Sequence, residues 1–322
     1  MPGLHVHPFG PEFIADAATL LARRHAEQRL VEPALPAAFE QPAAARAAIE
    51  ELAATDDASG AVATRGGTTV GYLLGTQRVD PTWGPNVWVE PAGHAVDEPE
   101  VVRDLYALAA ARWVDEGRTS HYVVAPTTDP ALIDAWFRLG FGQQHVHAIR
   151  EVPTQPLSRP PPGLLIRRPT RDDIDALARL ELVLPEHQQR SPVFSSLAPP
   201  PLGEVRAEWD EDFDNPAFAT FVALVDGRVV GSAIGCSVEE SGLHTGLTRP
   251  DNAAHLGFAA VFEDARGRGA GTALGATVID WASAEGYPAI VTDWRATNLL
   301  SSRTWPKLGF RPTFLRLFRA IA

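Results

Sequence analysis

The sequence of 322 residues contains only one cysteine, Cys236, and only one lysine, Lys307. A single cysteine excludes a disulfide framework and a cysteine-rich zinc site. Long hydrophobic runs are also missing, because no apolar stretch approaches the roughly 18 residues that a membrane-spanning helix needs. The first residues lack the charged and then apolar pattern of a signal peptide. These absences predict a soluble, cytoplasmic protein.

Positive charge is scarce relative to negative charge. The chain has 28 Lys and Arg residues against 40 Asp and Glu residues, which gives a formal net charge of -12 at pH 7. A field of this sign repels nucleic-acid phosphates and anionic membrane surfaces. We therefore expect neither nucleic acid nor a membrane as a partner, and the charge favours a cationic small molecule or peptide.

The sequence does contain enough apolar material for a core and enough length for more than one domain. Hydrophobic residues make up 45% of the chain and charged residues 21%, a composition that excludes wholesale disorder. At roughly 150 residues per domain, the length suggests about two domains.

One unit occurs twice in the chain. Leu139-Gly140-Phe141 recurs 169 positions later as Leu308-Gly309-Phe310. Matches at a fixed offset indicate a duplicated structural unit. Upstream the offset shrinks to 160, so the two copies are expected to differ in loop length. Further matches at these two offsets are Trp136 with Trp305, Asp129 with Asn298, Glu116-Gly117 with Glu285-Gly286, and Val70-Gly71 with Val230-Gly231.

A proline-rich stretch separates the two copies. Residues 153–163 read PTQPLSRPPPG, which is typical of a stiff, extended linker. We therefore place one domain at residues 1–152 and the other at residues 164–322.

Each copy has the pattern of a mixed α/β domain, with helices on both sides of one mixed sheet. In the second copy, Thr170 is expected to cap a helix whose first turn holds Asp172 and Asp173. A proline-interrupted loop from Pro185 to Pro201 follows and is a candidate lid. The expected strands cover residues 165–167, 218–225, 229–236, 255–261, 289–293 and 313–320, and two further helices cover residues 271–285 and 299–308.

The most informative segment is the glycine-rich turn between the strand that ends at Val261 and the helix that begins near Gly271. Glycines let successive backbone N–H groups turn toward one point, and a helix N-terminus adds partial positive charge, so such a turn can bind a pyrophosphate. The Walker motif requires Gly-Lys-Ser/Thr, and this turn has no lysine. The dinucleotide fingerprint also fails, because its third glycine would fall on Thr272 or Leu274.

The turn instead reads Arg-x-x-Gly-x-Gly, at Arg266, Gly269 and Gly271. Together with Asn298 and the Leu-Gly-Phe sequence that follows it, this motif resembles the acyl-CoA loop of the GNAT superfamily of N-acetyltransferases. The resemblance covers residues 164–322 well and the first half in weakened form. It implies two tandem GNAT-like acyl-CoA N-acyltransferase folds.

In the first half, the positions equivalent to the motif are Asp97, Glu100 and Val102. A turn of this acidic composition repels a pyrophosphate, so the first copy is expected to be degenerate and to have lost cofactor binding. For the glycine-rich turn of the second copy, the alternative interpretation is a turn that only lets a helix and a strand pack closely.

The resemblance implies that the second copy uses acetyl-CoA as co-substrate and transfers the acetyl group directly to a primary amine of a small molecule or peptide, in a ternary complex. The strand end would hold the pantetheine and the thioester, the turn would cradle the pyrophosphate, and the next helix start would touch the pantetheine arm. The residues that receive these roles are Ala259, Val261, Arg266, Gly267, Arg268, Gly269, Ala270, Gly271, Thr272, Asn298 and Ser301.

His255 is the first candidate for the base that deprotonates the amine. It lies six positions before Val261, where the histone-acetylating branch of the family carries its glutamate, and imidazole accepts a proton near neutral pH. The alternative is a strand histidine that only hydrogen-bonds to a neighbour. Glu239 and Glu240 are further candidates that would act through water, and surface solvation is the competing interpretation for both.

Trp305 departs from the family pattern. Many relatives have a tyrosine here that protonates the CoA sulfur, and an indole has no such proton to give. A thiol can leave as a thiolate, so the loss need not abolish catalysis. Ser301 and Ser302 are candidate substitutes, with a helix-surface role as the alternative.

The amine acceptor is expected at Trp209, Asp210 and Glu211, in an acidic and aromatic segment before the hairpin. Carboxylates beside an indole face attract a cationic amine through charge and cation–π contact. The alternative is a solvated helix whose Trp209 packs inward.

No metal site is expected from the sequence. His5 and His7 alternate along one expected strand, and His145 and His147 along another, but two nitrogens without a nearby carboxylate do not make a site. Three functions stay open: an N-acetyltransferase, a non-enzymatic acyl-CoA-binding or regulatory module, and a thioesterase that uses water as the acceptor.

Overall fold

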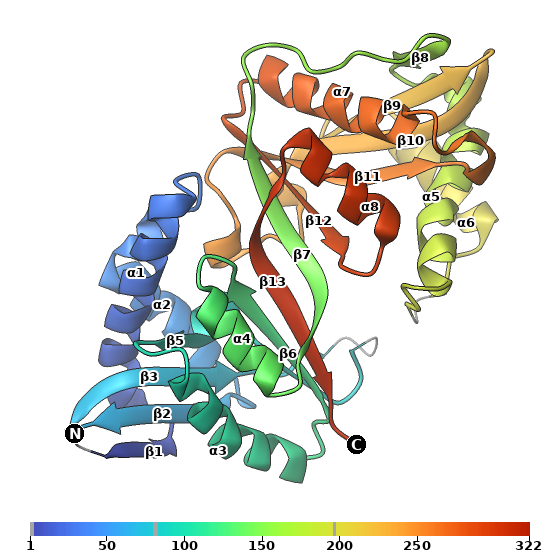
Figure 1. Ribbon diagram of the computed structural model, residues 1–322. Helices are drawn as coiled ribbons and strands as arrows, with labels where there is room; N and C mark the ends of the chain where they lie inside the picture. The colour runs from blue at the N-terminus through green and yellow to red at the C-terminus, as the bar shows by residue number, and fades with distance from the viewer. Residues whose placement is uncertain (1–2, 80–82, 196–197) are drawn as a thin grey trace. The chain divides into compact units, whose positions relative to one another are not determined.

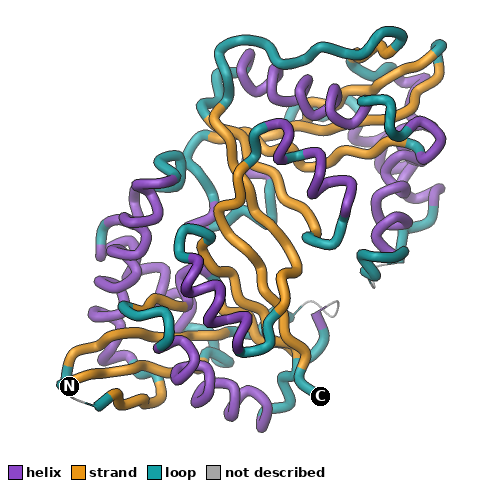
Figure 2. The backbone as a smooth tube through the Cα atoms, in the orientation of Figure 1, coloured by secondary structure: helices purple, strands orange, loops and turns teal. Residues whose placement is uncertain are grey.

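The computed structural model describes residues 3–79, 83–195 and 198–322. The chain divides into two compact units, and each contains both helices and strands (Figures 1 and 2). Unit 1 comprises Met1–Val146, Thr245–Asp251 and Pro312–Ala322, and unit 2 comprises His147–His244 and Asn252–Arg311. The units therefore do not follow the linear division at the proline-rich linker, because most of the last strand of the chain belongs to unit 1.

Unit 1 holds the elements of the first half and the C-terminal strand. They are β1 (Leu4–Pro8), α1 (Ile14–Val31), α2 (Pro42–Ala53), β2 (Ser59–Arg65), β3 (Thr68–Gly75), β4 (Asn86–Val89), β5 (His94–Val96), α3 (Val101–Asp115), β6 (Ser120–Pro126), α4 (Pro130–Arg138) and β13 (Arg311–Ala320). Four strands form a sheet in the order β1-β2-β3-β5, with antiparallel pairs. β6 pairs with β4 in parallel and with β13 in antiparallel fashion.

Unit 2 holds the elements of the second half. They are β8 (Leu164–Arg167), α5 (Ile174–Gln189), α6 (Leu202–Asp212), β9 (Phe218–Val225), β10 (Arg228–Ser237), β11 (Ala253–Val261), α7 (Ala270–Ala284), β12 (Ala289–Arg295) and α8 (Leu299–Thr304). Its strands have the order β12-β11-β10-β9-β8. β11 and β12 are parallel, and the remaining neighbours are antiparallel. The boundary between the units falls inside β7 (Gly142–Glu151), at His147.

The secondary structure confirms the duplication expected from the sequence. α3 and α7 begin at Val101 and Ala270 and have 15 residues each, so they lie at the offset of the Leu-Gly-Phe match. β6 and β12, and likewise β7 and β13, begin and end at the same offset. Upstream, α1 and α5 begin at Ile14 and Ile174, at the shorter offset. The chain is therefore a tandem repeat of one α/β unit with mixed sheets, as predicted.

Helices cover both faces of the sheet in unit 2 (Figure 1). On one face, Leu177 and Leu180 of α5 belong to a core cluster with Val222 of β9. On the other face, α7 packs so closely on β10 that a Cβ atom at Gly235 would lie 2.7 Å from the Trp281 ring. A glycine is required at this position because any side chain would push α7 away from the sheet. The close contact therefore fixes how near α7 lies to the sheet.

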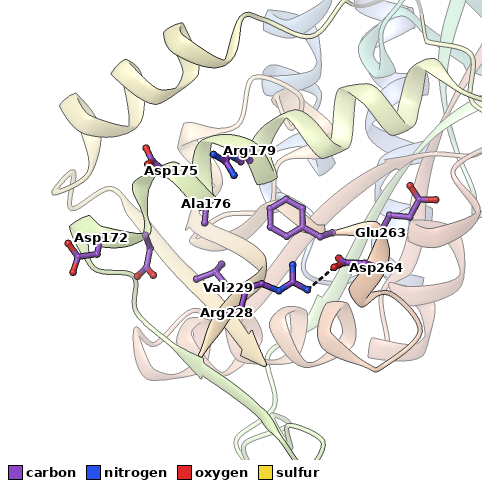
Figure 3. A pocket seen from close by; sticks show the side chains of 10 residues that line it. Asp172, Asp175, Ala176, Arg179, Arg228, Val229, Glu263 and Asp264 are labelled. Carbon is purple, nitrogen blue, oxygen red and sulfur yellow. Dashed lines mark hydrogen bonds and ion pairs between the residues drawn. The ribbon is translucent and has the colours of Figure 1, made fainter. Parts of the chain in front are cut away.

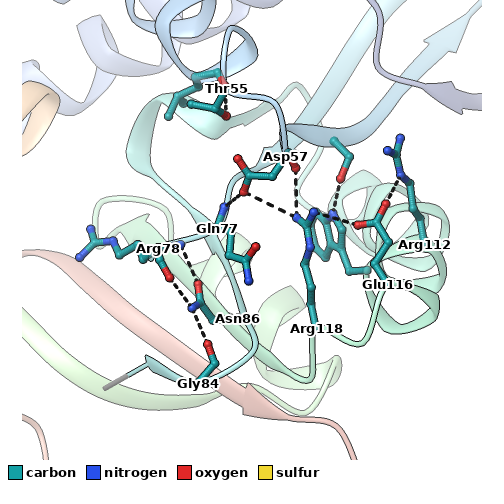
Figure 4. A network of polar contacts seen from close by, with 12 residues as sticks. Thr55, Asp57, Gln77, Arg78, Gly84, Asn86, Arg112, Glu116 and Arg118 are labelled. Carbon is teal, nitrogen blue, oxygen red and sulfur yellow. Dashed lines mark hydrogen bonds and ion pairs between the residues drawn. The ribbon is translucent and has the colours of Figure 1, made fainter. Parts of the chain in front are cut away.

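Unit 1 has its own core and its own polar network. α1 and α2 contribute Leu21 and Ile49 to a core cluster. The amide of the fully buried Asn86 donates 2.8 Å hydrogen bonds to the carbonyl oxygens of Arg78 and Gly84 (Figure 4). Arg118 donates a 3.0 Å bond to the carbonyl oxygen of Asp57 in the same network. The donors and acceptors shown there bond to one another, so we interpret the network as structural.

Two local expectations for the second copy need correction. Pro185 was expected to begin a loop, but α5 continues through it to Gln189. The helix loses one backbone N–H there, and Val183, two residues earlier, packs against the core cluster and holds this turn in place. The expected helix over residues 299–308 divides into α8 and a 3-10 turn at Pro306–Leu308, since Pro306 has no N–H for a helical bond. Residues 196–197 of the expected loop lie outside the described residues.

A β-bulge in β11 lies where β11 and β12 stop pairing. The β10–β11 register shifts between Ile234 and Gly235, whose partners are Phe258 and Leu256, so Gly257 is the extra residue of a β-bulge. The parallel pairing of β11 with β12 runs only as far as Leu256 and Thr292, although both strands continue. The two strands therefore part where the bulge begins.

Candidate functional site

A pocket of about 410 Å³ opens in unit 2 where the end of β11 meets the start of α7. The turn between them contains Gly267 and Gly269, whose φ angles of 77° and 84° are in the left-handed region that favours glycine. Gly269 is the N-cap residue of α7, so the free N–H groups of the first helical turn point away from the helix toward the pocket mouth. The 15-residue helix adds partial positive charge there. This geometry suits an anion.

The charge of the pocket wall is opposite to that of the whole chain. Arg266, Arg303 and Lys307 line it, and none of its described lining residues is an Asp or a Glu. In a chain of net charge -12, a wall with three cations and without carboxylates selects for a polyanionic ligand. The complete lining is Val183, Leu184, His187, Ala259, Ala260, Val261, Ala265, Arg266, Gly267, Gly269, Ala270, Gly271, Thr272, Asn298, Leu299, Leu300, Ser301, Arg303, Thr304, Trp305 and Lys307.

Ten of the eleven residues predicted for the cofactor line this pocket, and Arg268 does not. The half-buried Arg266 folds back so that its Nε donates a 3.2 Å hydrogen bond to the carbonyl oxygen of Val261. Arg268 is exposed. The two arginines of the motif therefore differ, and only Arg266 lies in the pocket wall.

Asn298 positions the far side of the pocket. It is buried, and its Oδ1 accepts hydrogen bonds from the backbone N–H groups of Leu300 and Ser301 at 3.1 and 3.4 Å. Its Oδ1 also lies 3.3 Å from the Nε2 atom of His187 on α5. Asn298 thus caps α8 and connects it to α5, which holds both walls of the pocket in register.

Trp305 forms part of the pocket wall and also packs. A Cβ atom at Gly275 of α7 would lie 2.9 Å from its ring, and the ring meets Phe310 edge-on at 6.4 Å. Its counterpart in unit 1, Trp136, is fully buried against Tyr106 and Phe141. The two tryptophans share a packing role, and Trp305 also lines the pocket of unit 2.

His255 lies in a cluster of titratable side chains on the strands that part. Its Nε2 atom is 3.5 Å from Oδ1 of Asp293 on β12, and the Nε2 atom of His244 is 3.8 Å from the same oxygen. Both histidines are buried, and Asp293 is partly exposed. The Sγ atom of Cys236 lies 3.9 Å from Nδ1 of His255, and burial raises the pKa of this thiol to about 11. The thiol is therefore protonated at neutral pH and is a poor nucleophile.

The other predicted catalytic residues lie apart from this cluster. Glu239 and Glu240 are exposed in a 3-10 turn at Val238–Glu240, where Glu239 accepts a hydrogen bond from the Ser237 hydroxyl. Ser302 is half-buried on α8 and is not among the lining residues, whereas Ser301 is.

The predicted acceptor residues lie on α6 and do not line the pocket. The Trp209 indole N–H donates a 2.6 Å hydrogen bond to Glu181 of α5, and its ring packs against the core cluster. Burial raises the pKa of Glu181 despite this bond. Asp210 pairs with Arg171 at 3.4 Å, and Glu211 is exposed. Trp209 therefore packs inward, which is the alternative raised for it from the sequence.

A second hollow of about 730 Å³ lies beside α5 and the β9–β10 turn (Figure 3). Asp172 and Asp175 line it, and an Arg228–Asp264 ion pair of 2.8 Å crosses it. Its carboxylates make it unsuitable for a polyanion. We therefore assign no ligand to it.

The sequence reading missed the contribution of α5. Val183, Leu184 and His187 line the pocket, and no motif in the sequence marks them. Lys307 is different, because it is the only lysine of the chain and closely follows the motif residue Trp305. Its rarity in the composition was a signal that could have drawn attention to it.

Residues 183–310 match the acetyltransferase (GNAT) family. The fold resembles that of a GCN5-related N-acetyltransferase from Sphaerobacter thermophilus, with 13% identity and a TM-score of 0.55 over 98% of this chain and 95% of that chain. No curated protein matches the sequence.

Two further solved structures are similar. One, described as the GCN5-related glucosamine N-acetyltransferase region of a fungal multi-domain GH3 β-N-acetylglucosaminidase, has 15% identity and a TM-score of 0.50 over 99% of this chain and 38% of that chain. A tandem GNAT protein from the clavulanic acid biosynthesis pathway has 16% identity and a TM-score of 0.47, over 98% of this chain and 97% of that chain. Within the described residues, no helix is long and apolar enough to cross a membrane.

Proposed function

We propose that this chain, whose residues 183–310 match the acetyltransferase (GNAT) family, is an N-acetyltransferase that moves an acetyl group from acetyl-CoA to a primary amine. The acceptor is a small molecule or a peptide, and the transfer is direct, within a ternary complex. Unit 2 carries the reaction, and unit 1 has a structural or acceptor-shaping role.

The observation that carries this proposal is the charge of the pocket wall. CoA presents a pyrophosphate and a further phosphate, and it enters a protein of strong negative charge only where carboxylates are absent. The glycine-rich turn offers backbone N–H groups, and Arg266 adds a charged donor. The residues of the pocket therefore fit the co-substrate in charge and in hydrogen-bond donors.

The parting of β11 from β12 suits the other end of CoA. Beyond Leu256, β11 is no longer paired with β12, so the backbone groups of Ala259 and the backbone N–H of Val261 are available to the pantetheine arm and the thioester. Apolar residues of α5 and α8, such as Val183 and Leu299, cover the arm from outside. The bulge at Gly257 and the unpaired end of β11 thus leave backbone hydrogen-bonding groups free for the linear pantetheine part of CoA.

His255 is the group we assign as general base. The amine must lose a proton as its nitrogen attacks the thioester carbon, and the C–S bond then breaks and releases the CoA thiolate. Asp293, at 3.5 Å, stabilises the imidazolium that His255 becomes. Trp305 has no proton to give to the sulfur, so the thiolate takes its proton from water.

A second candidate function is acyl-CoA binding without turnover, which the indole of Trp305 in the pocket wall favours. The first experiment is a calorimetric titration with acetyl-CoA. One site per chain is expected, and Gly271→Val should abolish it, because a Cβ there meets only Val261 at 3.7 Å and the larger side chain enters the pocket. Gly203→Val, a glycine of α6 with open space around it, is the matched control.

The outcomes of this titration separate the candidates. Two sites per chain would show that unit 1 also binds, and no binding would overturn the acetyltransferase proposal. If one site is found, turnover is then measured with a panel of amines and with none. Transfer to amines supports the enzyme, hydrolysis without amine indicates a thioesterase, and binding without either reaction indicates a binding module.

A further inference from the structure

His244 is a buried polar side chain that makes no side-chain hydrogen bond to any described residue. Its residue exposure is 1%, and neither Nδ1 nor Nε2 has a hydrogen-bond partner there. A buried polar group left without a partner costs about 1–3 kcal/mol. Such a group at the centre of a cluster of other donors requires an explanation, and a bound ion is one that also accounts for the neighbouring donors.

Three donor atoms converge on the same space. One atom each from His244, His255 and Asp293 lies within 4.8 Å of the other two, and the rings of the histidines are 5.3 Å apart between centroids. The Nε2 atoms of both histidines approach a single carboxylate oxygen, at 3.8 and 3.5 Å. The ring of a fourth residue, His147, meets that of His244 edge-on at 5.1 Å.

The backbone explains why these residues meet. β11 and β12 are parallel, and His255 is the direct partner of Val291. Asp293 is two residues beyond Val291 and therefore projects from the same face of the sheet. His244 reaches the same space from the loop after β10. Two of the three donors are thus fixed by a sheet, which is the arrangement that holds ligands with least freedom.

We propose that His244, His255 and Asp293 form a binding site for a divalent transition metal ion of the zinc class. Two imidazoles and one carboxylate are borderline donors that suit such an ion, whereas Mg²⁺ and Ca²⁺ prefer oxygen ligands alone. Tetrahedral bonds of about 2.0–2.1 Å place donor atoms about 3.4 Å apart. The two nitrogen–oxygen distances are close to this value, so small side-chain rotations complete the site.

An ion pair alone explains the positions of fewer of these side chains than a metal ion does. A protonated His255 beside Asp293 accounts for two of the residues and leaves both nitrogens of His244 without a hydrogen bond, because its Nε2 atom stays 3.8 Å from the same carboxylate oxygen. A metal ion accounts for all three. It also revises the sequence expectation of no metal, which considered only histidines that are near one another in sequence.

The site has one consequence that rests on the proposed function. The metal would occupy Nε2 of His255, and the same lone pair is needed by the proposed base. Metal binding and base catalysis therefore exclude each other, so the ion would inhibit acetyl transfer. The binding itself does not depend on the reaction and is measured without acetyl-CoA.

The test is a titration of the full-length, chelator-treated protein with Co²⁺. Low-coordinate cobalt with nitrogen ligands gives visible d–d absorption bands, and we expect them to saturate at one equivalent per chain and to disappear when Zn²⁺ is added. His244→Ala and the nearly isosteric Asp293→Asn should each weaken binding by about 100-fold or more. Circular dichroism and acetyl-CoA affinity check that each variant is folded.

The matched control is the double variant His5→Ala with His7→Ala, which removes two exposed histidines of unit 1. It should leave the cobalt spectrum unchanged. The proposal is overturned if no d–d bands appear, if folded Asp293→Asn binds as tightly as the wild type, or if the control variant removes the bands. Failure of acetyl transfer by the metal-free, chelator-treated protein, when the same protein gives the expected cobalt spectrum on titration, would overturn the proposed function alone.

Discussion

The N-termini of α3 and α7 are the same place in two copies of one unit, and they have opposite electrostatics. In unit 1, β5 ends at Val96 and α3 begins at Val101, whereas in unit 2 β11 ends at Val261 and α7 begins at Ala270. The strand registers match, because Gly71 pairs with Val96 as Gly231 pairs with Val261. The connection in unit 1 is therefore shorter by four residues.

The shorter connection of unit 1 already contains its own anions. The N-cap of α3 is Glu100, with a φ of -63°, where α7 has Gly269 in the left-handed region. Glu100 accepts hydrogen bonds from Arg138 and Arg103, and these bonds lower the pKa of its carboxyl group. A ligand anion would have to displace these pairs and face the remaining charge of the connection.

The comparison teaches that a fold does not carry its binding site with it. The same strand–turn–helix serves as an anion cradle where the turn is long and glycine-rich, and as a closed, self-neutralised surface where it is short and acidic. A few residues of loop decide between the two outcomes while the layers around them stay unchanged.

The largest expected effect is on kcat, and it tests whether the reaction takes place in unit 2. His255→Gln should lower kcat by about 100- to 10,000-fold, because glutamine cannot take the proton of the amine, while the affinity for acetyl-CoA stays near the wild-type value. Steady-state kinetics with the best amine of the panel, together with calorimetry, separates the two effects.

The controls for this prediction are the rival bases. Glu239→Gln and Glu240→Gln change exposed carboxylates and should leave kcat within a few-fold of the wild type. A large loss in either variant with normal turnover in His255→Gln would move the base to the 3-10 turn after β10.

The next effect is on the pH dependence of stability, and it comes from a histidine of unit 1. His25 is buried, with Nε2 2.8 Å from the carbonyl oxygen of Pro36, and burial lowers its pKa to about 4. Since the unfolded chain takes up this proton near pH 6.5, stability is full above that pH and falls as the pH decreases toward 4. This one group contributes at most about 3 kcal/mol to the loss.

The measurement is urea unfolding at several pH values between 7.5 and 4.5. His25→Gln retains an N–H donor for Pro36 and cannot be protonated, so its free energy of unfolding should depend less steeply on pH. An unchanged slope in the variant would show that His25 takes up its proton alike in the folded and unfolded states. The buried His94, whose pKa is lowered to about 3, acts in the same direction and contributes to the remaining slope.

The sequence predicted features that depend on local interactions and did not predict those that depend on tertiary contacts. The repeat, the strands, the helix beginning near Gly271 and most of the pocket wall follow from local patterns and one motif, and the structure contains them. Val183 and His187 could not be found, because their role depends on how α5 lies over the sheet. His244 was missed for the same reason, since it meets His255 and Asp293 only through the loop after β10 and the parallel pairing of β11 with β12.

The smallest expected effect sharpens the description of the anion cradle. Arg266 lines the pocket, whereas Arg268, two residues further along, is exposed. Charge reversal at each position therefore separates a direct contact with acetyl-CoA from long-range electrostatic attraction. Arg266→Glu should weaken acetyl-CoA binding by about 10- to 100-fold, because a hydrogen bond to a charged group contributes about 1.5–3 kcal/mol. Arg268→Glu should change it only a few-fold, and less at high salt, where exposed charges are screened. Calorimetric titrations at two salt concentrations provide both numbers. Equal losses in the two variants, removed alike by salt, would mean that the second copy attracts the cofactor by field alone and that Arg266 makes no direct contact with it.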